Sequence, residues 1–289
     1  MKQLTIFTPT YNRAYSLPRL YDSLLKQDTS LFKWLIVDDG STDNTKELVD
    51  GWISEGKLEI KYMYQKNAGK MAAHNLGVKE CDTELFLCCD SDDWMAENSI
   101  KPALDFWNAY QKELSGMVGP RDNKKSDTDT LETLPKNEKT DTLSGLYKKG
   151  YFGETALFFK TSVIRQYPFP VIDGEKFIPE GYVYRQLDDK YELLIYPTYC
   201  MDCEYQPDGY TNNGLKLKIK NPKSSLLNEM DILKRNFTIK GAIRVLGLLE
   251  FVGEPYKITK LPHPLTMAML LPLGKIIAAR YNKLKKEFK

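Results

Sequence analysis

The sequence predicts an α/β fold, in which a mainly parallel, Rossmann-like sheet is flanked by helices and followed by a helical tail. Three observations predict it. Short apolar runs alternate with segments of helical periodicity from Leu4 to Trp107, acidic clusters follow two of these runs, and a stretch rich in Lys and Leu begins at Lys216. Because strand–helix–strand crossovers are right-handed and place the strands in parallel, helices should cover both faces of the sheet.

The composition is that of an ordinary globular protein, with 289 residues, 42% of them hydrophobic and 28% charged. The 41 basic and 39 acidic residues give a formal net charge of +2, which is too balanced for an electrostatic binder of nucleic acid. The opening MKQLTIFT leads into a strand without the apolar stretch and cleavage site of a secretory signal. We therefore expect a cytoplasmic protein with no nucleic-acid partner.

The first two strand–helix units are the clearest. Leu4 to Thr8 is a β-rich run that ends at Pro9, and Ser16 then stands at the position of a helix N-cap. The apolar residues of that helix are Leu17, Leu20, Tyr21, Leu24 and Leu25. The continuous apolar run Trp34 to Val37, before Asp38, is typical of a strand buried on both faces. The next helix has the apolar face Leu48, Val49, Trp52 and Ile53.

Two further units follow. Leu58 to Tyr64 is expected to be extended and Met71 to Val78 helical. Leu85 to Cys89 has the pattern of a buried strand. The apolar face of the fourth helix is Ile100, Ala103, Leu104 and Trp107. Four repeats of the same unit indicate one parallel sheet.

After Gly119 the pattern changes. Pro120 to Thr142 holds only two leucines among polar residues, so we expect a long surface excursion. The alternation then resumes with a strand at Gly153 to Lys160, a short helix at Tyr182 to Tyr191 and strand pairs in Leu193 to Tyr205. The sequence therefore predicts one α/β domain over residues 1–210.

Residues 211–289 are expected to form a basic helical extension, with helical periodicity in Leu226 to Arg235, in Ile239 to Phe251 and from Leu261 onward. Leu265 to Ala279 is apolar, but it contains Pro272 and is shorter than the ~20 residues of a bilayer span. Basic residues follow it: Arg280, Lys283, Lys285, Lys286 and Lys289. This pattern favours an amphipathic helix at the cytoplasmic face of the inner membrane. A homodimer interface and packing on the catalytic domain are the alternatives.

The five cysteines form an odd, scattered set, which argues against a disulfide framework: Cys81, Cys88, Cys89, Cys200 and Cys203. Cys200 and Cys203 make a CxxC, but no second pair or neighbouring histidines accompany it in the sequence. We expect all five to be small core residues.

Two acidic clusters stand where strands should end, DDGSTD at Asp38 to Asp43 and DSDD at Asp90 to Asp93. Ligands of an open parallel sheet bind beyond the carboxyl ends of its strands, so both clusters should line one crevice. Each cluster alone is more simply explained as a helix cap or an Asx turn, but two in one domain favour a site. Carboxylates without a histidine pair favour a hard cation such as Mg²⁺ or Mn²⁺, and Asp90 and Asp92 fit this description.

Four motifs in a fixed order make a family resemblance specific: TPTYN at Thr8 to Asn12, DDGSTD, NAGKMAAHN at Asn67 to Asn75, and DSDD. This order resembles the family 2 glycosyltransferases, and in particular those of bacterial surface polysaccharides. Members have the GT-A fold and are generally inverting. The match is close from Met1 to Trp94 and looser to about residue 210.

The resemblance implies a UDP-sugar donor bound with Mn²⁺ or Mg²⁺. Asp39 would accept a hydrogen bond from the uracil edge, and Asp90 and Asp92 would form the metal and diphosphate motif, with Asp92 the direct ligand. The residues expected at the donor are Thr8, Pro9, Tyr11, Asp39, Lys66, Asn67, Gly69, Asp90 and Ser91. The residue types agree, since an aromatic ring offers a stacking face, a carboxylate accepts an N–H and glycine permits close approach.

Inverting transfer needs a carboxylate that deprotonates the acceptor hydroxyl. The segment DGEKFIPEGYVY resembles the stretch that carries the family's Glu-Asp pair, and Glu180 takes the Glu position. Gly181 stands where the Asp is usual, so the assignment of the base rests on Glu180 alone. Glu175 and Asp173 are competing candidates, and stabilisation of a helix N-terminus is the structural alternative for Glu180.

His74 also departs from the family pattern, which commonly has Arg before the residue that matches Asn75. It either contacts phosphate or packs in the core, and we do not expect it to be a metal ligand.

The sequence therefore predicts an inverting, metal-dependent glycosyltransferase that transfers a sugar from a UDP-sugar to a hydroxyl of a saccharide or lipid-linked acceptor. Asp208 to Thr211 resembles a segment that closes over the donor in related enzymes, and the following lysines are more simply a solvated face. A catalytically inactive, nucleotide-sugar-binding partner subunit is the alternative. A phosphohydrolase leaves TPTYN and DDGSTD unexplained, and a nucleotidyltransferase needs a glycine-rich loop after the first strand.

Overall fold

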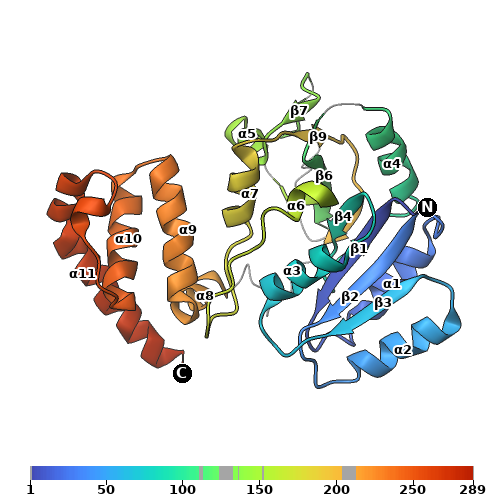
Figure 1. Ribbon diagram of the computed structural model, residues 1–289, viewed down its shortest axis with the longest axis horizontal. Helices are drawn as coiled ribbons and strands as arrows, with labels where there is room; N and C mark the ends of the chain where they lie inside the picture. Colours follow the sequence, from blue (N-terminus) through green and yellow to red (C-terminus); the bar gives the residue numbers. More distant parts are fainter. Residues whose placement is uncertain are drawn as a thin grey trace. The chain divides into compact units, whose positions relative to one another are not determined.

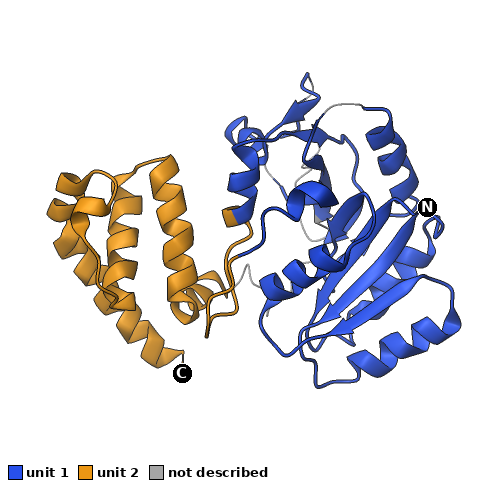
Figure 2. Cartoon of the chain, viewed as in Figure 1, with its two compact units in different colours: residues 1–169, 183–206 blue, residues 170–182, 207–289 orange. Residues whose placement is uncertain are grey.

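The computed structural model describes residues 2–110, 113–123, 133–135, 137–151, 153–203 and 213–288. The chain forms two compact units (Figure 2): unit 1 comprises Met1–Phe169 and Val183–Gln206, and unit 2 comprises Pro170–Tyr182 and Pro207–Lys289. Unit 1 contains the sheet, and unit 2 is helical (Figure 1). The domain boundary at residue 210 stays a prediction, because it lies outside the described residues.

The first half of unit 1 consists of strand–helix units, as predicted. Its elements are β1 (Leu4–Thr10), α1 (Leu17–Leu25), β2 (Phe32–Asp38), α2 (Thr45–Glu55), β3 (Ile60–Tyr64), α3 (Lys70–Glu80), β4 (Leu85–Cys88), β5 (Trp94–Met95) and α4 (Ile100–Asn108). All seven residues of β1 are buried, as expected for a central strand with helices over both faces. Ser16 is the N-cap residue of α1, but its own backbone is helical, and its hydroxyl donates to the Arg13 carbonyl instead of capping the helix.

The second half of the chain's α/β part is less regular. Its elements are β6 (Gly116–Asn123), β7 (Thr140–Asp141), α5 (Leu143–Lys148), β8 (Thr155–Lys160), α6 (Thr161–Ile164), α7 (Gly181–Asp188), β9 (Leu193–Ile195) and β10 (Met201–Cys203). The prediction of a surface excursion over Pro120 to Thr142 is wrong at both ends, where β6 and β7 extend into it. Most of its middle, residues 124–132 and 136, lies outside the described residues.

The described strands form a curled, mixed sheet in the order β3-β2-β1-β4-β8-β6-β10-β5, with β9 paired to β6 and β7. Strands β3, β2, β1 and β4 run parallel (Figure 1). Strand β8 runs antiparallel to both of its neighbours, whereas β9 and β10 are parallel to β6. The prediction of a mainly parallel sheet flanked by helices is confirmed.

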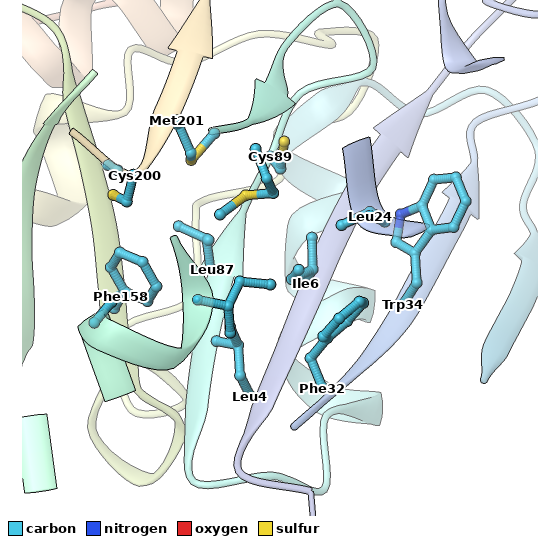
Figure 3. Packing of buried hydrophobic residues seen from close by; sticks show 14 of the residues in the cluster. Leu4, Ile6, Leu24, Phe32, Trp34, Leu87, Cys89, Phe158, Cys200 and Met201 are labelled. Carbon is cyan, nitrogen blue, oxygen red and sulfur yellow. The ribbon is translucent and has the colours of Figure 1, made fainter. Parts of the chain in front are cut away.

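The core of unit 1 lies between the sheet and helices α1, α2 and α4. Trp34 of β2 stacks on Tyr21 and Trp52, with ring centroids 6.2 and 5.7 Å away, and its indole N–H donates to Thr8 Oγ1 at 2.9 Å. Cys89 and Cys200 lie in the same cluster (Figure 3). None of the five cysteines forms a disulfide. Four are buried core residues as predicted, whereas Cys88 is partly exposed.

Unit 2 contains the predicted helical tail. Its described helices are α8 (Gly214–Lys220), α9 (Pro222–Arg235), α10 (Ile239–Val252), the 3₁₀ helix η3 (Ile258–Lys260) and α11 (Pro264–Glu287). Helix α10 begins at a capping Thr238, whose hydroxyl accepts from the Gly241 N–H, and ends at Gly253 with φ of 75°. None of the helices in the described part of the chain has the length and hydropathy to span a bilayer.

Candidate functional site

Four loops of unit 1 meet at one edge of the sheet. Thr10, the last residue of β1, is in register with Asp38, the last residue of β2, and Asp38 is in register with Tyr64 at the end of β3. Strand β4 runs parallel to β1 on its other side. The TPTYN, DDGSTD, NAGKMAAHN and DSDD motifs therefore all begin at the carboxyl ends of neighbouring parallel strands, as the sequence predicts.

The loops after β1 and β2 are bonded to each other. The Asn12 N–H donates to Ser41 Oγ at 2.9 Å, and Asn12 Oδ1 accepts from the Thr42 N–H at 2.8 Å. Asp43 Oδ2 accepts from the Ala14 N–H at 3.1 Å. These bonds fix the loop that carries Tyr11, whose side chain is half exposed and so offers a ring face at this edge.

Asp39 is the organising side chain of the loop after β3. Its Oδ1 accepts from Gln65 Nε2 at 2.7 Å and from the Ala68 N–H at 2.8 Å, and its Oδ2 accepts from the Gly69 N–H at 2.8 Å. These bonds use three of the roughly four lone-pair positions of a carboxylate, so one more donor can be accepted. The carboxylate thus shapes the loop that the family resemblance assigns to the donor.

Gly40 explains why these loops can lie so close. Its φ is 87°, and a Cβ there would come within 2.9 Å of the Asn67 backbone nitrogen. Any other residue would be strained and would push the Asn67 segment away.

Asp39→Ala should therefore weaken both the fold and nucleotide binding. The variant leaves two backbone N–H groups without their acceptor, so we expect a loss of roughly 2–3 kcal/mol in unfolding free energy. We also expect UDP affinity to fall at least ~10-fold, about 1.4 kcal/mol. Chemical denaturation and isothermal titration measure the two effects. Asp50→Ala, on the exposed face of α2, is the control and should change neither by much. Unchanged UDP affinity in Asp39→Ala would contradict the prediction.

The DSDD cluster contains an ion pair that the sequence analysis missed. Lys70, the first residue of α3, places Nζ 2.7 Å from Asp90 Oδ2, and its side chain is largely buried. Burial raises the pKa of Asp90, but the charges of Lys70 and Arg121 outweigh burial and hold that pKa below its ordinary value. Asp90 is therefore a charged carboxylate at neutral pH.

Asp92 and Asp93 have different environments. Burial raises the pKa of Asp92, and the negative charge of Asp90 raises it further because the two carboxylates repel each other. Asp93 is buried and pairs with Arg121 of β6 at 2.6 Å. Arg121 was also missed, because it lies in the stretch predicted to be a surface excursion. Asp93 is thus buried and paired within the protein, whereas Asp90 and Asp92 are partly exposed.

A third cation supports the backbone of this cluster. Arg19 of α1 donates from Nη2 to the Asp92 carbonyl at 2.6 Å, and its guanidinium lies 3.8 Å from the centre of the Trp94 ring. This contact fixes the peptide that carries the Asp92 side chain.

The carboxylates of Asp90 and Asp92 are suited to bind a hard divalent cation. Among the described residues, no three His, Cys, Asp or Glu side chains gather as a metal site. Mg²⁺ and Mn²⁺ bound beside a substrate diphosphate need only one or two protein carboxylates, because phosphate oxygens and water complete the shell. The mutual repulsion of Asp90 and Asp92 is what such a cation would relieve.

The remaining predicted donor residues lie at different depths. Lys66 is exposed, Asn67 is partly exposed, and Gly69 is buried with φ of 95°. Ser91 is buried. Thr8 and Pro9 are buried within β1, and the Thr8 hydroxyl is occupied by the Trp34 indole. The donor contacts of all these residues stay predictions.

His74 packs in the core. Its ring makes edge contacts with Phe7, Phe86 and Phe169, with centroids 5.7, 5.2 and 5.0 Å away. Burial, together with the charge of Lys70, lowers its pKa to about 3, although Asp90 acts in the opposite direction. Of the two interpretations left open by the sequence, packing is the one observed.

This histidine should make the protein sensitive to acid. The folded-state pKa of about 3 lies below the ordinary 6.5, so the unfolded chain binds the extra proton between these values and stability falls as pH falls. Between pH 7 and pH 5 we expect the titration of His74 to lower the free energy of unfolding by about 2 kcal/mol. Denaturant unfolding of the wild type and of His74→Phe at both pH values measures it, because all other titrating groups are shared. Equal losses in the two proteins would contradict the prediction.

The candidate bases belong to the segment of unit 2 before α7. Glu180 immediately precedes that helix, as predicted. Glu175 accepts from the Lys223 and Ser224 N–H groups at 2.8 and 2.7 Å and so holds the first turn of α9. Glu175 is therefore committed to structure. The segment Asp208 to Thr211, expected to close over the donor, lies outside the described residues.

Comparison with known proteins identifies the family. The sequence model of glycosyl transferase family 2 matches residues 5–168, more than half of the chain. The chain is 28% identical over 116 residues to the poly(ribitol-phosphate) beta-N-acetylglucosaminyltransferase TarS of Staphylococcus aureus, an alignment that covers 39% of this chain and only 20% of that relative.

Solved structures agree on the fold. A crystal structure of S. aureus TarS 1–349 in complex with UDP-GlcNAc has a TM-score of 0.63 at 17% identity, covering 86% of this chain and 71% of that one. The mannosyltransferase PcManGT from Pyrobaculum calidifontis, in complex with GDP-Man and Mn²⁺, has a TM-score of 0.56 at 17% identity, covering 97% and 75%. The chain therefore has the GT-A fold and belongs to glycosyl transferase family 2.

Proposed function

We propose that this protein is an inverting, metal-dependent glycosyltransferase that moves a sugar from a UDP-sugar to a hydroxyl of a saccharide or lipid-linked acceptor in surface polysaccharide biosynthesis. One observation carries the proposal: Asp39 on the loop after β2 and Asp90 and Asp92 on the loop after β4 stand at one sheet edge, with the Lys70 cation paired to Asp90. The likeness to TarS, a poly(ribitol-phosphate) beta-N-acetylglucosaminyltransferase with a solved UDP-GlcNAc complex, supports the donor and the class of polymer biosynthesis.

Each group has a task in donor binding. Tyr11 offers a stacking face to the base, and the remaining acceptor position of Asp39 receives the N–H of a uracil edge. Asp90 and Asp92 would hold Mn²⁺ or Mg²⁺ beside the diphosphate, and the likeness to PcManGT, solved with GDP-Man and Mn²⁺, supports this assignment. Lys70 lies next to this position and adds a positive charge from the protein itself.

The transfer step then needs one base. The Glu180 carboxylate takes the proton of the acceptor hydroxyl, whose oxygen forms a bond to the anomeric carbon as the bond to the diphosphate oxygen breaks. The configuration at the anomeric carbon is inverted, and UDP departs with the bonding electrons. When bound, the divalent cation offsets the charge that develops on the departing diphosphate. Lys70 stabilises that charge. Because Lys70 and the DSDD backbone are already fixed in the folded protein, neither has to reorganise during the step.

The donor site is tested first by thermal shift with UDP, GDP, CDP and TDP, each with and without Mn²⁺. A ligand that binds only the folded state stabilises it by RT ln(1 + [L]/Kd), so a hundredfold excess over Kd gives ~2.7 kcal/mol. We expect UDP with Mn²⁺ to give the largest shift. A shift with GDP alone would overturn the UDP assignment, and no shift with any nucleotide would overturn the donor site.

An inactive partner subunit that binds the nucleotide sugar is a second candidate, favoured by Gly181 at the position of the usual Asp. The two candidates differ in turnover. Slow hydrolysis of a bound UDP-sugar in the presence of Mn²⁺ marks the enzyme, whereas tight binding without hydrolysis or transfer marks the partner.

A further inference from the structure

Helix α11 has one buried face and one exposed apolar face. Its buried residues, Met267, Gly274, Ala278 and Tyr281, pack toward the rest of unit 2. The approach to α10 is close, because a Cβ on Gly274 would lie 2.5 Å from Leu246 Cβ. The helix forms an outer layer of unit 2 next to α10 (Figure 1). No helix in the described part of unit 2 therefore covers its opposite side.

That opposite side is apolar over three turns. Leu265, Met269, Leu273 and Ile276 are 84%, 81%, 45% and 64% exposed. Their spacing of 4, 4 and 3 residues keeps them within one narrow sector of the helix, a stripe ~17 Å long at 1.5 Å per residue. Large apolar side chains this exposed are unusual on a water-facing helix, so the stripe needs an occupant.

The charges around the stripe are of one sign. Between Pro255 and Lys286 the chain has seven Lys and Arg residues and no Asp or Glu. Arg280 and Lys283 continue the same face of α11 beyond Ile276. In the described part of the chain, no ion pair joins Lys275, Arg280, Lys283 or Lys286 to a carboxylate, so their charge is available to an outside partner.

We propose that the outer face of α11 binds the surface of an anionic lipid bilayer. An apolar stripe bordered by cations is suited to lie at the headgroup boundary, with the apolar side chains among the acyl chains and Arg280 and Lys283 at the phosphates. A second copy of the chain is a poorer occupant, because it would bring a like-charged helix to the same face. A stripe of four side chains is also small beside the 20–30 residues that each partner gives to a stable interface.

Co-sedimentation with vesicles tests this proposal without any enzymatic readout, and so independently of the reaction proposed for unit 1. The full chain is mixed with vesicles of phosphatidylcholine alone or with 30% phosphatidylglycerol, at low salt and at 0.5 M NaCl. We expect at least ~10-fold stronger binding to the anionic vesicles at low salt, reduced at high salt by screening.

Two double variants separate the apolar contribution to vesicle binding from the electrostatic one. Met269→Glu with Ile276→Glu puts charge into the apolar stripe, and Arg280→Glu with Lys283→Glu reverses the cationic end. Each should weaken binding at least ~10-fold. The matched controls are Val171→Glu, an exposed apolar residue of unit 2, and Lys148→Glu, an exposed lysine of α5. Both controls should bind as the wild type does, and circular dichroism melts check that all variants are folded.

Several outcomes would overturn the proposal. Wild-type protein that stays in the supernatant with anionic vesicles contradicts it directly, as does equal binding to neutral vesicles. Unchanged binding by the stripe variant would mean that another surface contacts the lipid. Dimers in light scattering that Met269→Glu with Ile276→Glu converts to monomers, without vesicle binding by the wild type, would assign the stripe to a second copy.

Discussion

Asp92→Asn should lower turnover about 10³-fold, a rise of about 4 kcal/mol in the activation barrier, with little or no loss of stability. Asp92 carries a carboxylate whose pKa is raised by burial and by the charge of Asp90, so the neutral amide relieves repulsion in the free protein. In the proposed complex the same change removes a ligand of the divalent cation. A catalytic loss without a stability loss is therefore the mark of a ligand side chain, and initial rates of UDP release together with thermal melts measure both.

The nucleotide shift should change in the same variant. In the wild type we expect UDP to stabilise the fold more with Mn²⁺ than without it, and in Asp92→Asn we expect that difference to disappear. Asp22→Asn, an exposed aspartate of α1, is the control and should retain both the rate and the Mn²⁺ dependence. A variant of Asp92 that keeps its Mn²⁺-dependent UDP shift would remove the carboxylate from the proposed metal site.

The regular half of the fold could be predicted because each element carries its own signal. Strand β2 is apolar almost throughout, since it is buried on both faces, and α1 has one apolar face at helical spacing. Strand β6 has no such signal after Val118. Its last residues, PRDN, are held by backbone pairing to β8 and β10 and by the ion pair of Arg121 with Asp93. Those partners are distant in the sequence, so no local pattern indicates them.

The candidate site also has features with a local sequence signal and features that depend on distant partners. The acidic clusters follow strands of a parallel sheet, which is why their meeting at one edge could be predicted. Lys70 and Arg121 could not be predicted, because a cation in a sequence does not reveal which carboxylate it faces. Lys70 does have one local signal in hindsight: it is the first residue of a helix, where an anion rather than a cation is favoured. The nearby Asp90 carboxylate offsets that unfavourable position.

Glu180→Gln should lower turnover ~10² to 10⁴-fold while UDP binding stays within about twofold of the wild type. The amide keeps the shape of the side chain but cannot take a proton from the acceptor hydroxyl, so the loss falls on the transfer step. Single-turnover rates with a saturating UDP-sugar, beside titration of UDP, separate the two quantities. Product NMR on the residual activity should show the inverted anomer, because the attack geometry is unchanged.

The neighbouring carboxylates make this test specific. Glu175 holds the first turn of α9 through two backbone N–H groups, so Glu175→Gln should reduce the unfolding free energy by roughly 1–2 kcal/mol and leave the turnover of folded protein almost unchanged. Asp173→Asn should change neither, because Asp173 is exposed. If Asp173→Asn lost turnover and Glu180→Gln did not, the base would be Asp173. If neither variant lost turnover, the base would lie outside this segment, and the assignment to Glu180 would be wrong.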